Sequence, residues 1–146
     1  MLNSLNDLFQ RDISKIQEEL GMYKDESSMW QTVDGISNSG GNLALHVAGN
    51  LQHFIGAVLG NSGYVRQRDL EFSQKNVPTD TVIQELEKAK TVVAKTLSEL
   101  SVEDLQKPFP INVFKKEMTT EWFLFHLLTH TSYHHGQINY HRRLIR

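Results

Sequence analysis

Four long segments of the sequence repeat apolar residues at steps of three and four, and this periodicity decides the fold class. Such spacing places apolar side chains on one face of an α-helix. The segments span residues 2 to about 22, 42–59, 79 to about 100 and 120 to about 143. The first stripe consists of Leu2, Leu5, Phe9, Ile13, Ile16 and Leu20. Helices of this kind bury their stripes against one another, so the sequence predicts an all-α four-helix bundle.

The connections between these helices differ in length. Residues 23–41 and 61–78 are each long enough to cross a bundle from end to end, so an up-and-down order of helices is not guaranteed. Residues 106–118 contain two prolines and the alternating run INVF, which favours an extended crossover with a short edge strand. Ser101, with Asp104 three residues later, predicts a short capped turn before it. We therefore expect long crossover connections.

The second long connection carries Arg66, Arg68, Asp69 and Glu71. Runs of charge are usually solvated, so the favoured interpretation is an exposed loop with internal ion pairs. The alternative is a rim over a pocket that binds an anionic ligand. Just upstream, Gly49 lies inside a predicted helix, where glycine costs about 1 kcal/mol relative to alanine. A close helix-to-helix contact would account for it.

The length and composition predict one globular domain that spans residues 1–146. The chain is 39% hydrophobic and 22% charged, and no internal repeat or domain boundary is visible. It contains no cysteine, which excludes disulfides, thiolate metal sites and cysteine nucleophiles.

The charge pattern and the hydropathy pattern argue against two classes of partner. The net charge of -2 lacks the clustered basic excess that nucleic acid requires, so we expect no nucleic-acid partner. The N-terminal helix does not resemble a secretory signal, and no stretch approaches the roughly 20 apolar residues of a membrane span. We expect a cytoplasmic protein with no membrane partner.

The histidines gather in the last predicted helix. Five of the seven are His126, His130, His134, His135 and His141. The first three are spaced four residues apart and so share one helix face. No acidic residue follows Glu121, so this face offers only imidazole, the commonest metal ligand in proteins.

The spacing predicts half of a metal site. Two histidines at positions i and i+4 lie about 6 Å apart at Cβ and can bind one ion. His130 with His134 meets this demand, and His126 with His130 meets it equally well. His46 or His53, on the second predicted helix, could supply a third ligand. Three protein ligands would leave positions open for water or substrate, as in catalytic sites.

A bland alternative competes with this prediction. Histidines near an apolar face are often hydrogen-bonded core or boundary residues. A further alternative is a plain helical dimer with surface histidines. We interpret His135 and His141 as non-ligands, because His135 points about 100° away from its neighbour and His141 lies at the helix end. No HExxH or Glu-x-x-His motif is present.

Two stretches resemble the DinB-like metalloproteins. HTSYHHGQI, residues 130–138, resembles the H-x-x-x-H-x-G-Q-hydrophobic signature of their last helix. NLALHVAGNLQHF, residues 42–54, looks like their second-helix segment, and RDLEF at 68–72 is similar to an uncharacterised branch. The resemblance covers essentially the whole chain. It implies a four-helix bundle that forms homodimers and binds one divalent metal ion.

By position, the resemblance makes His46, His130 and His134 the ligands. His53 and His126 then either support the ligands from outside or line the pocket. Asn50 and Gln137 are expected to hold the imidazole tautomers. The sequence singles out no other catalytic residue.

The resemblance also implies a reaction class. Characterised relatives are transferases that use bacillithiol, mycothiol or similar thiols, and some are hydrolases. We therefore expect nickel or zinc, a low-molecular-weight thiol and a small electrophilic substrate. The alternatives are a metal-dependent hydrolase and a non-catalytic, stress-related metal-binding protein.

Overall fold

The computed structural model describes residues 1–145, and its architecture is all-α. The long helices are α1 (Leu2–Gly21), α2 (Gly40–Leu51) with its continuation η2 (Gln52–Leu59), α4 (Thr79–Glu99) and α6 (Thr120–Leu144). The short ones are η1 (Ser27–Trp30), α3 (Arg68–Ser73) and α5 (Val102–Gln106). Among these residues the only β pairing is two isolated bridges. The predicted fold class is confirmed.

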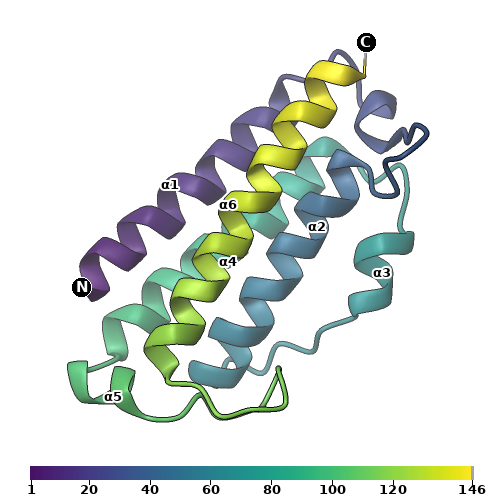
Figure 1. Cartoon of the computed structure of the whole chain (residues 1–146). Helices are drawn as coiled ribbons and strands as arrows, with labels where there is room; N and C mark the ends of the chain where they lie inside the picture. Colours follow the sequence, from purple (N-terminus) through teal and green to yellow (C-terminus); the bar gives the residue numbers. More distant parts are fainter. Residues whose placement is uncertain (146) are drawn as a thin grey trace.

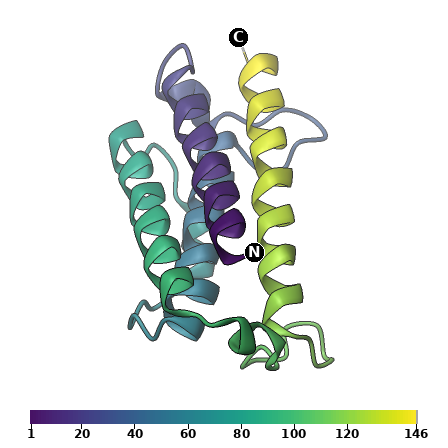
Figure 2. The same cartoon turned by 90° about the vertical axis from the view of Figure 1, so that its left-hand side faces the viewer.

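The four long helices form one bundle, in which α1 and α6 run in one direction and α2 and α4 in the other (Figures 1 and 2). Helices α1 and α2 each pack against both α4 and α6. Of the two long connections, residues 60–78 travel the length of the bundle, whereas residues 22–39 stay at one end (Figure 1). No helix in the described part of the chain is both long and apolar enough to cross a membrane.

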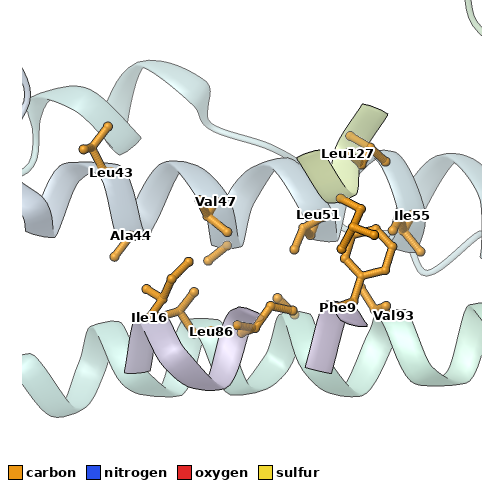
Figure 3. Close-up of a cluster of buried hydrophobic side chains, with 14 of the residues drawn as sticks. Phe9, Ile16, Leu43, Ala44, Val47, Leu51, Ile55, Leu86, Val93 and Leu127 are labelled. Atoms are coloured by element: carbon orange, nitrogen blue, oxygen red, sulfur yellow. The ribbon is translucent and has the colours of Figure 1, made fainter. Parts of the chain in front are cut away.

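The core lies where the apolar stripes of these helices meet. Figure 3 shows side chains from α1, α2, η2, α4 and α6 converging on one another. Phe9, Ile16, Val47, Leu51 and Leu86 are among its buried members. Each such side chain contributes about 1.5–3 kcal/mol to folding, so this core holds α2 and α6 in register.

Helix α2 begins two residues before the predicted start. The hydroxyl of Ser39 accepts the backbone N–H of Asn42 at 3.2 Å and caps the helix. Gly40 and Gly41 suggested a loop, but both lie inside the helix. A Cβ on Gly41 would lie 2.8 Å from the ring of Trp30, so glycine is needed there to let η1 pack against the first turn of α2.

The predicted second helix changes its winding after Leu51. Residues 52–59 form a π-helix, and Gly60 N–H donates to the carbonyl of Ile55 at 2.9 Å. A π-turn holds more residues than an α-turn. Residues after Leu51, His53 among them, are therefore rotated relative to the face that α-helical spacing predicts.

The two remaining connections are only partly as predicted. Ser101 and Asp104 form the expected capping box at the start of α5. Residues 111–114 are exposed and form no strand, because the crossover pairs only at its ends, where Phe109 N–H donates to Met118 O at 2.7 Å. Residues 61–78 contain α3, so the interpretation of this connection as a wholly solvated loop is wrong.

Candidate metal centre

Three imidazoles meet between α2 and α6. His130 Nε2 lies 3.2 Å from His46 Nε2 and 3.0 Å from His134 Nε2. One ring nitrogen from each residue lies within 4.8 Å of the other two. His46 is buried, and the other two are partly buried. The structure therefore brings together three histidines from segments more than eighty residues apart.

The surrounding packing explains this placement. Every residue of α2 is buried, so the His46 ring has to point into the bundle toward a neighbouring helix. On α6, the buried side chains of Leu127, Thr131 and Ile138 face the core. His130 and His134 lie at the edge of that buried face, one helical turn apart. Their rings therefore reach His46 and keep some contact with solvent.

Hydrogen bonds on the outer nitrogens decide how two of the rings are protonated. His46 Nδ1 lies 3.0 Å from Glu71 Oε1, and His134 Nδ1 lies 2.7 Å from Gln137 Oε1. Both partners accept, so each Nδ1 carries the proton and each Nε2 presents a lone pair. Within residues 1–145, the buried His130 Nδ1 has no hydrogen-bond partner.

The arrangement fits a bound cation. The Nε2 lone pairs of His46 and His134 both lie beside His130 Nε2. A single proton on His130 Nε2 could hydrogen-bond with only one of them. A tetrahedral ion with metal–nitrogen bonds of 2.0–2.1 Å places its ligand nitrogens about 3.3 Å apart. The measured separations of 3.0 and 3.2 Å are close to this spacing.

Burial keeps the two α6 imidazoles neutral. Burial, together with the neighbouring His134 and His46, lowers the pKa of His130 to about 3. Burial also lowers the pKa of His134, against the opposing hydrogen bond with Gln137. Neutral imidazole is the form that binds a metal ion.

A carboxylate that the sequence did not single out supports His46. Glu71, on α3, is only 6% exposed. Arg66 donates to it twice, from Nε to Oε2 at 2.9 Å and from Nη2 to Oε1 at 2.9 Å. Burial raises the pKa of Glu71, but the hydrogen bonds from His46 and Arg66 outweigh burial and leave the pKa lowered. Glu71 is therefore ionised.

The sequence held one signal for this contact. A Cβ on Gly49 would lie 2.0 Å from Glu71 Oε2, so the glycine leaves room for the carboxylate. The expectation of a close contact at Gly49 was right, but its partner is the Glu71 side chain on α3 and not a packed long helix.

The other predicted pocket residues lie outside the cluster. His53, on η2, packs edge-on against Phe54 with ring centroids 4.7 Å apart. Burial lowers the pKa of His53, and Arg66 lowers it further. Asn50 is buried, and its Oδ1 has no hydrogen-bond partner in the described part of the chain. Of the two residues expected to hold imidazole tautomers, only Gln137 hydrogen-bonds a histidine of the cluster.

His126 lies in an aromatic group beside the cluster. Its ring stacks on Trp122 with centroids 5.5 Å apart and meets the edge of Phe114 at 5.0 Å. The His126 centroid is 6.3 Å from that of His130, whereas the His134 centroid is 4.4 Å away. His126 and His134 are both four residues from His130, so the packing of their side chains, and not their spacing, explains why only His134 joins the cluster.

A cavity of about 410 Å³ adjoins the cluster on the His134 side. It lies between the connection before α2 and the C-terminal half of α6. Its walls are Gly35, Ile36, Ser37, Asn38, Leu43, His134, Gln137, Tyr140, His141 and Leu144. Among residues 1–145, no lysine, arginine or carboxylate lines it, so it suits a mainly apolar small molecule.

Comparison with known proteins places the chain in a family. The model of the family described as "Protein of unknown function (DUF1572)" matches residues 1–146. The chain belongs to the DUF1572 family. No curated protein matches this DUF1572 chain.

A solved structure shares the fold of this DUF1572 protein. It is described as "Crystal structure of the conserved protein of locus from Enterococcus faecalis". The match has a TM-score of 0.82 and 15% sequence identity, and it covers 99% of this chain and 96% of that chain. At this identity the likeness supports the bundle architecture. Membership in the DinB-like proteins stays a prediction.

Proposed function

We propose that this protein binds one divalent metal ion through His46, His130 and His134. The convergence of their Nε2 atoms at 3.0 and 3.2 Å carries the proposal. Glu71 and Gln137 support it, because their hydrogen bonds aim two of the lone pairs inward. Imidazole binds both nickel and zinc, the two metals that we expect.

The proposed site is catalytic and acts on a small molecule. Three protein ligands leave coordination positions free, and the cavity beside His134 provides room for a substrate. A bound ion would lower the pKa of a thiol or a water in those positions. Gln137 would keep His134 oriented while its own side chain forms part of the substrate wall.

The finer proposal is transfer of a low-molecular-weight thiol to a small electrophile. The resemblance to the DinB-like proteins supports this reaction, and the absence of cysteine is consistent with an external thiol. Metal-dependent hydrolysis, and metal binding without catalysis, remain the alternatives that the experiments below separate.

Metal binding is tested on untagged protein. After incubation with Zn²⁺ or Ni²⁺ and removal of free ions, elemental analysis should find one ion per chain. The His46→Ala, His130→Ala and His134→Ala variants should each lose it. His135→Ala is the matched control on α6 and should retain it. Wild type without bound metal, or ligand variants that bind as well as wild type, would overturn the proposal.

The reaction is tested on the metal-loaded protein. Bacillithiol with 1-chloro-2,4-dinitrobenzene probes thiol transfer, and 4-nitrophenyl acetate probes hydrolysis. A rate above that of thiol and electrophile alone, lost in His46→Ala, supports the transferase. Activity on the ester alone favours the hydrolase, and a metal-loaded protein without either activity favours the non-catalytic alternative.

We also propose that two copies associate through an exposed face of α6. The apolar residues of this face are Trp122, Phe125, Tyr133, Tyr140 and Leu144, and all are at least 41% exposed. Gly136 lies in the same face, and among the described residues nothing outside its own stretch of helix lies within 4 Å of a Cβ built on it, so a second helix could approach closely there. An antiparallel partner would set Glu121 near the basic Arg142 and Arg143 of the other copy.

A further inference from the structure

The connection between η2 and α4 contains the most deeply buried arginine–carboxylate pair among the described residues. Arg66 precedes α3 and Glu71 lies within it, and their side chains are 12% and 7% exposed. Burying a carboxylate and a guanidinium together is costly unless their hydrogen bonds are well formed. Here both guanidinium contacts are 2.9 Å long, so the pair is held in one geometry.

Glu71 Oε1 links this ion pair to the metal centre. The same oxygen accepts from Arg66 Nη2 at 2.9 Å and lies 3.0 Å from His46 Nδ1. The second oxygen is held by Arg66 Nε. The carboxylate therefore cannot rotate away from His46 without breaking a contact to Arg66. Arg66 Nη2 also lies 3.4 Å from His46 Nδ1, but the contact of Nδ1 with the carboxylate is shorter and favours a proton on Nδ1. The restraint therefore fixes both the tautomer of His46 and the direction of its ring.

Helix α2 is shaped to receive the carboxylate. Gly49 lies where any larger residue would strike Glu71, since a Cβ there would be 2.0 Å from Oε2. The side-chain amide of Asn42 donates to the carbonyls of Glu71 at 3.0 Å and Gln74 at 2.8 Å. Phe72 packs against the His46 ring with centroids 4.8 Å apart. Backbone, carboxylate and aromatic contacts thus all bring α3 to His46.

We propose that Glu71 and Arg66 are positioning residues for His46, so that the metal site is complete only when residues 64–74 are docked on α2. This inference rests on the proposed metal binding by His46, His130 and His134. Arg66 neutralises the carboxylate and orients it, while Glu71 holds the proton of His46 on Nδ1. Groups that support metal-bound histidines in this way typically change metal affinity by about 10–100-fold when they are replaced.

The first experiment compares two equivalent substitutions on α3. Glu71→Gln removes the buried charge, and Asp69→Asn makes the same chemical change at an exposed position two residues away. Zn²⁺ affinity, measured by competition with a chelator, should fall about 10–100-fold in Glu71→Gln and stay at the wild-type value in Asp69→Asn. Equal affinities in all three proteins would overturn the proposal.

Two further variants test the positioning role without removing the charge of Glu71. Gly49→Ala leaves every polar group in place but displaces the carboxylate. Gly21→Ala is its control, because no described residue outside its own stretch of helix lies within 4 Å of a Cβ there. Arg66→Lys keeps the charge but loses the two-pronged geometry. Both Gly49→Ala and Arg66→Lys should weaken Zn²⁺ binding, and wild-type affinity in both would contradict the inference.

The tautomer of His46 gives a readout in metal-free protein. Nitrogen NMR of the imidazole should show the proton on Nδ1 in wild type and a mixture of tautomers in Glu71→Gln and Gly49→Ala. An unchanged tautomer in both variants would overturn the positioning role. If wild type binds no metal but its His46 tautomer depends on Glu71, the proposed function fails while the positioning contact stands.

Discussion

At the scale of single residues, the site depends on which nitrogen of each imidazole faces inward. His46 and His134 each have a hydrogen-bond acceptor on Nδ1, at 3.0 and 2.7 Å, and His130 has none in the part of the chain that the structure describes. The two held rings can receive a metal ion without changing their tautomers. We therefore expect the acceptors to matter for affinity, although neither would touch the ion.

Gln137 allows a direct test of this expectation. Replacing it with Met keeps the length of the side chain but removes the acceptor for His134 Nδ1. Zn²⁺ affinity in a chelator competition should fall about 10–100-fold. Ser132→Ala, at an exposed position of the same helix, serves as the control. A wild-type affinity in Gln137→Met would show that His134 needs no such partner.

His141 is a second buried imidazole with a structural role. It lies 2.6 Å from Tyr23 Oη and 2.8 Å from the carbonyl of Gln31, and Glu19 and Arg142 lie near this group. Burial lowers the pKa of His141, against the opposing hydrogen bond with the Gln31 carbonyl. Folding therefore favours the neutral form, and the unfolded chain binds the additional proton.

This shift gives a pH dependence with a definite sign. The contribution of His141 is fully present above the unfolded pKa near 6.5 and is lost as the pH falls below it. The free energy of unfolding of metal-free protein, measured with urea, should decrease from pH 7.5 to pH 5. The decrease should be smaller in His141→Gln, which cannot take up the proton. An equal decrease in both proteins would contradict this role.

At the scale of elements, two short segments contact α2, one near each of its ends. The 3₁₀-helix η1 brings Trp30 against Gly41, and α3 brings Glu71 against Gly49. Both contacts use a glycine whose missing side chain lets another segment approach. The short elements thus determine how α2 sits beside α6, and with it the position of His46.

The contact between η1 and α2 predicts a stability change. Gly41→Ala would place a methyl group 2.8 Å from the Trp30 ring, so the free energy of unfolding should fall by about 1–3 kcal/mol. Gly21→Ala meets no other segment among residues 1–145 and should leave stability unchanged or slightly raised. Urea unfolding of both variants measures the difference. Equal stabilities would mean that η1 moves aside without cost.

At the scale of the whole molecule, the bundle leaves an apolar face of α6 exposed next to the metal centre. Large exposed apolar patches commonly mark interaction sites. A two-fold antiparallel contact between copies would cover it and bring together opposite charges at the helix ends. The proposed dimer would then border both the histidine cluster and the cavity beside His134.

One substitution tests the dimer. Tyr140 is 71% exposed, the most of the apolar residues in this face, so Tyr140→Glu should convert a dimer to a monomer in sedimentation velocity experiments. Val102→Glu adds the same charge at a residue of α5 that is 67% exposed, and it should leave the dimer intact. A wild-type protein that sediments as a monomer at tens of micromolar would overturn the proposal.

The sequence by itself determined the elements of this protein and half of its candidate site. Apolar spacing located the four long helices, and the i, i+4 rule placed His130 and His134 on one face, because both depend only on the geometry of a single helix. The cap of α5 followed from Ser101 and Asp104 for the same reason. The resemblance to DinB-like proteins selected His46 as the third histidine, and the structure brings it to the other two.

Only the tertiary structure decided the contacts between distant segments. His126 and His134 are equivalent in spacing, and the packing of α6 against α2 is what sets His134 beside His46. From the sequence, Glu71 and Arg66 were predicted to be solvated charges, because no local pattern reveals that a connection will fold back onto α2. Burial changed their role, since a carboxylate enclosed beside an imidazole and a guanidinium can keep its charge only by binding both.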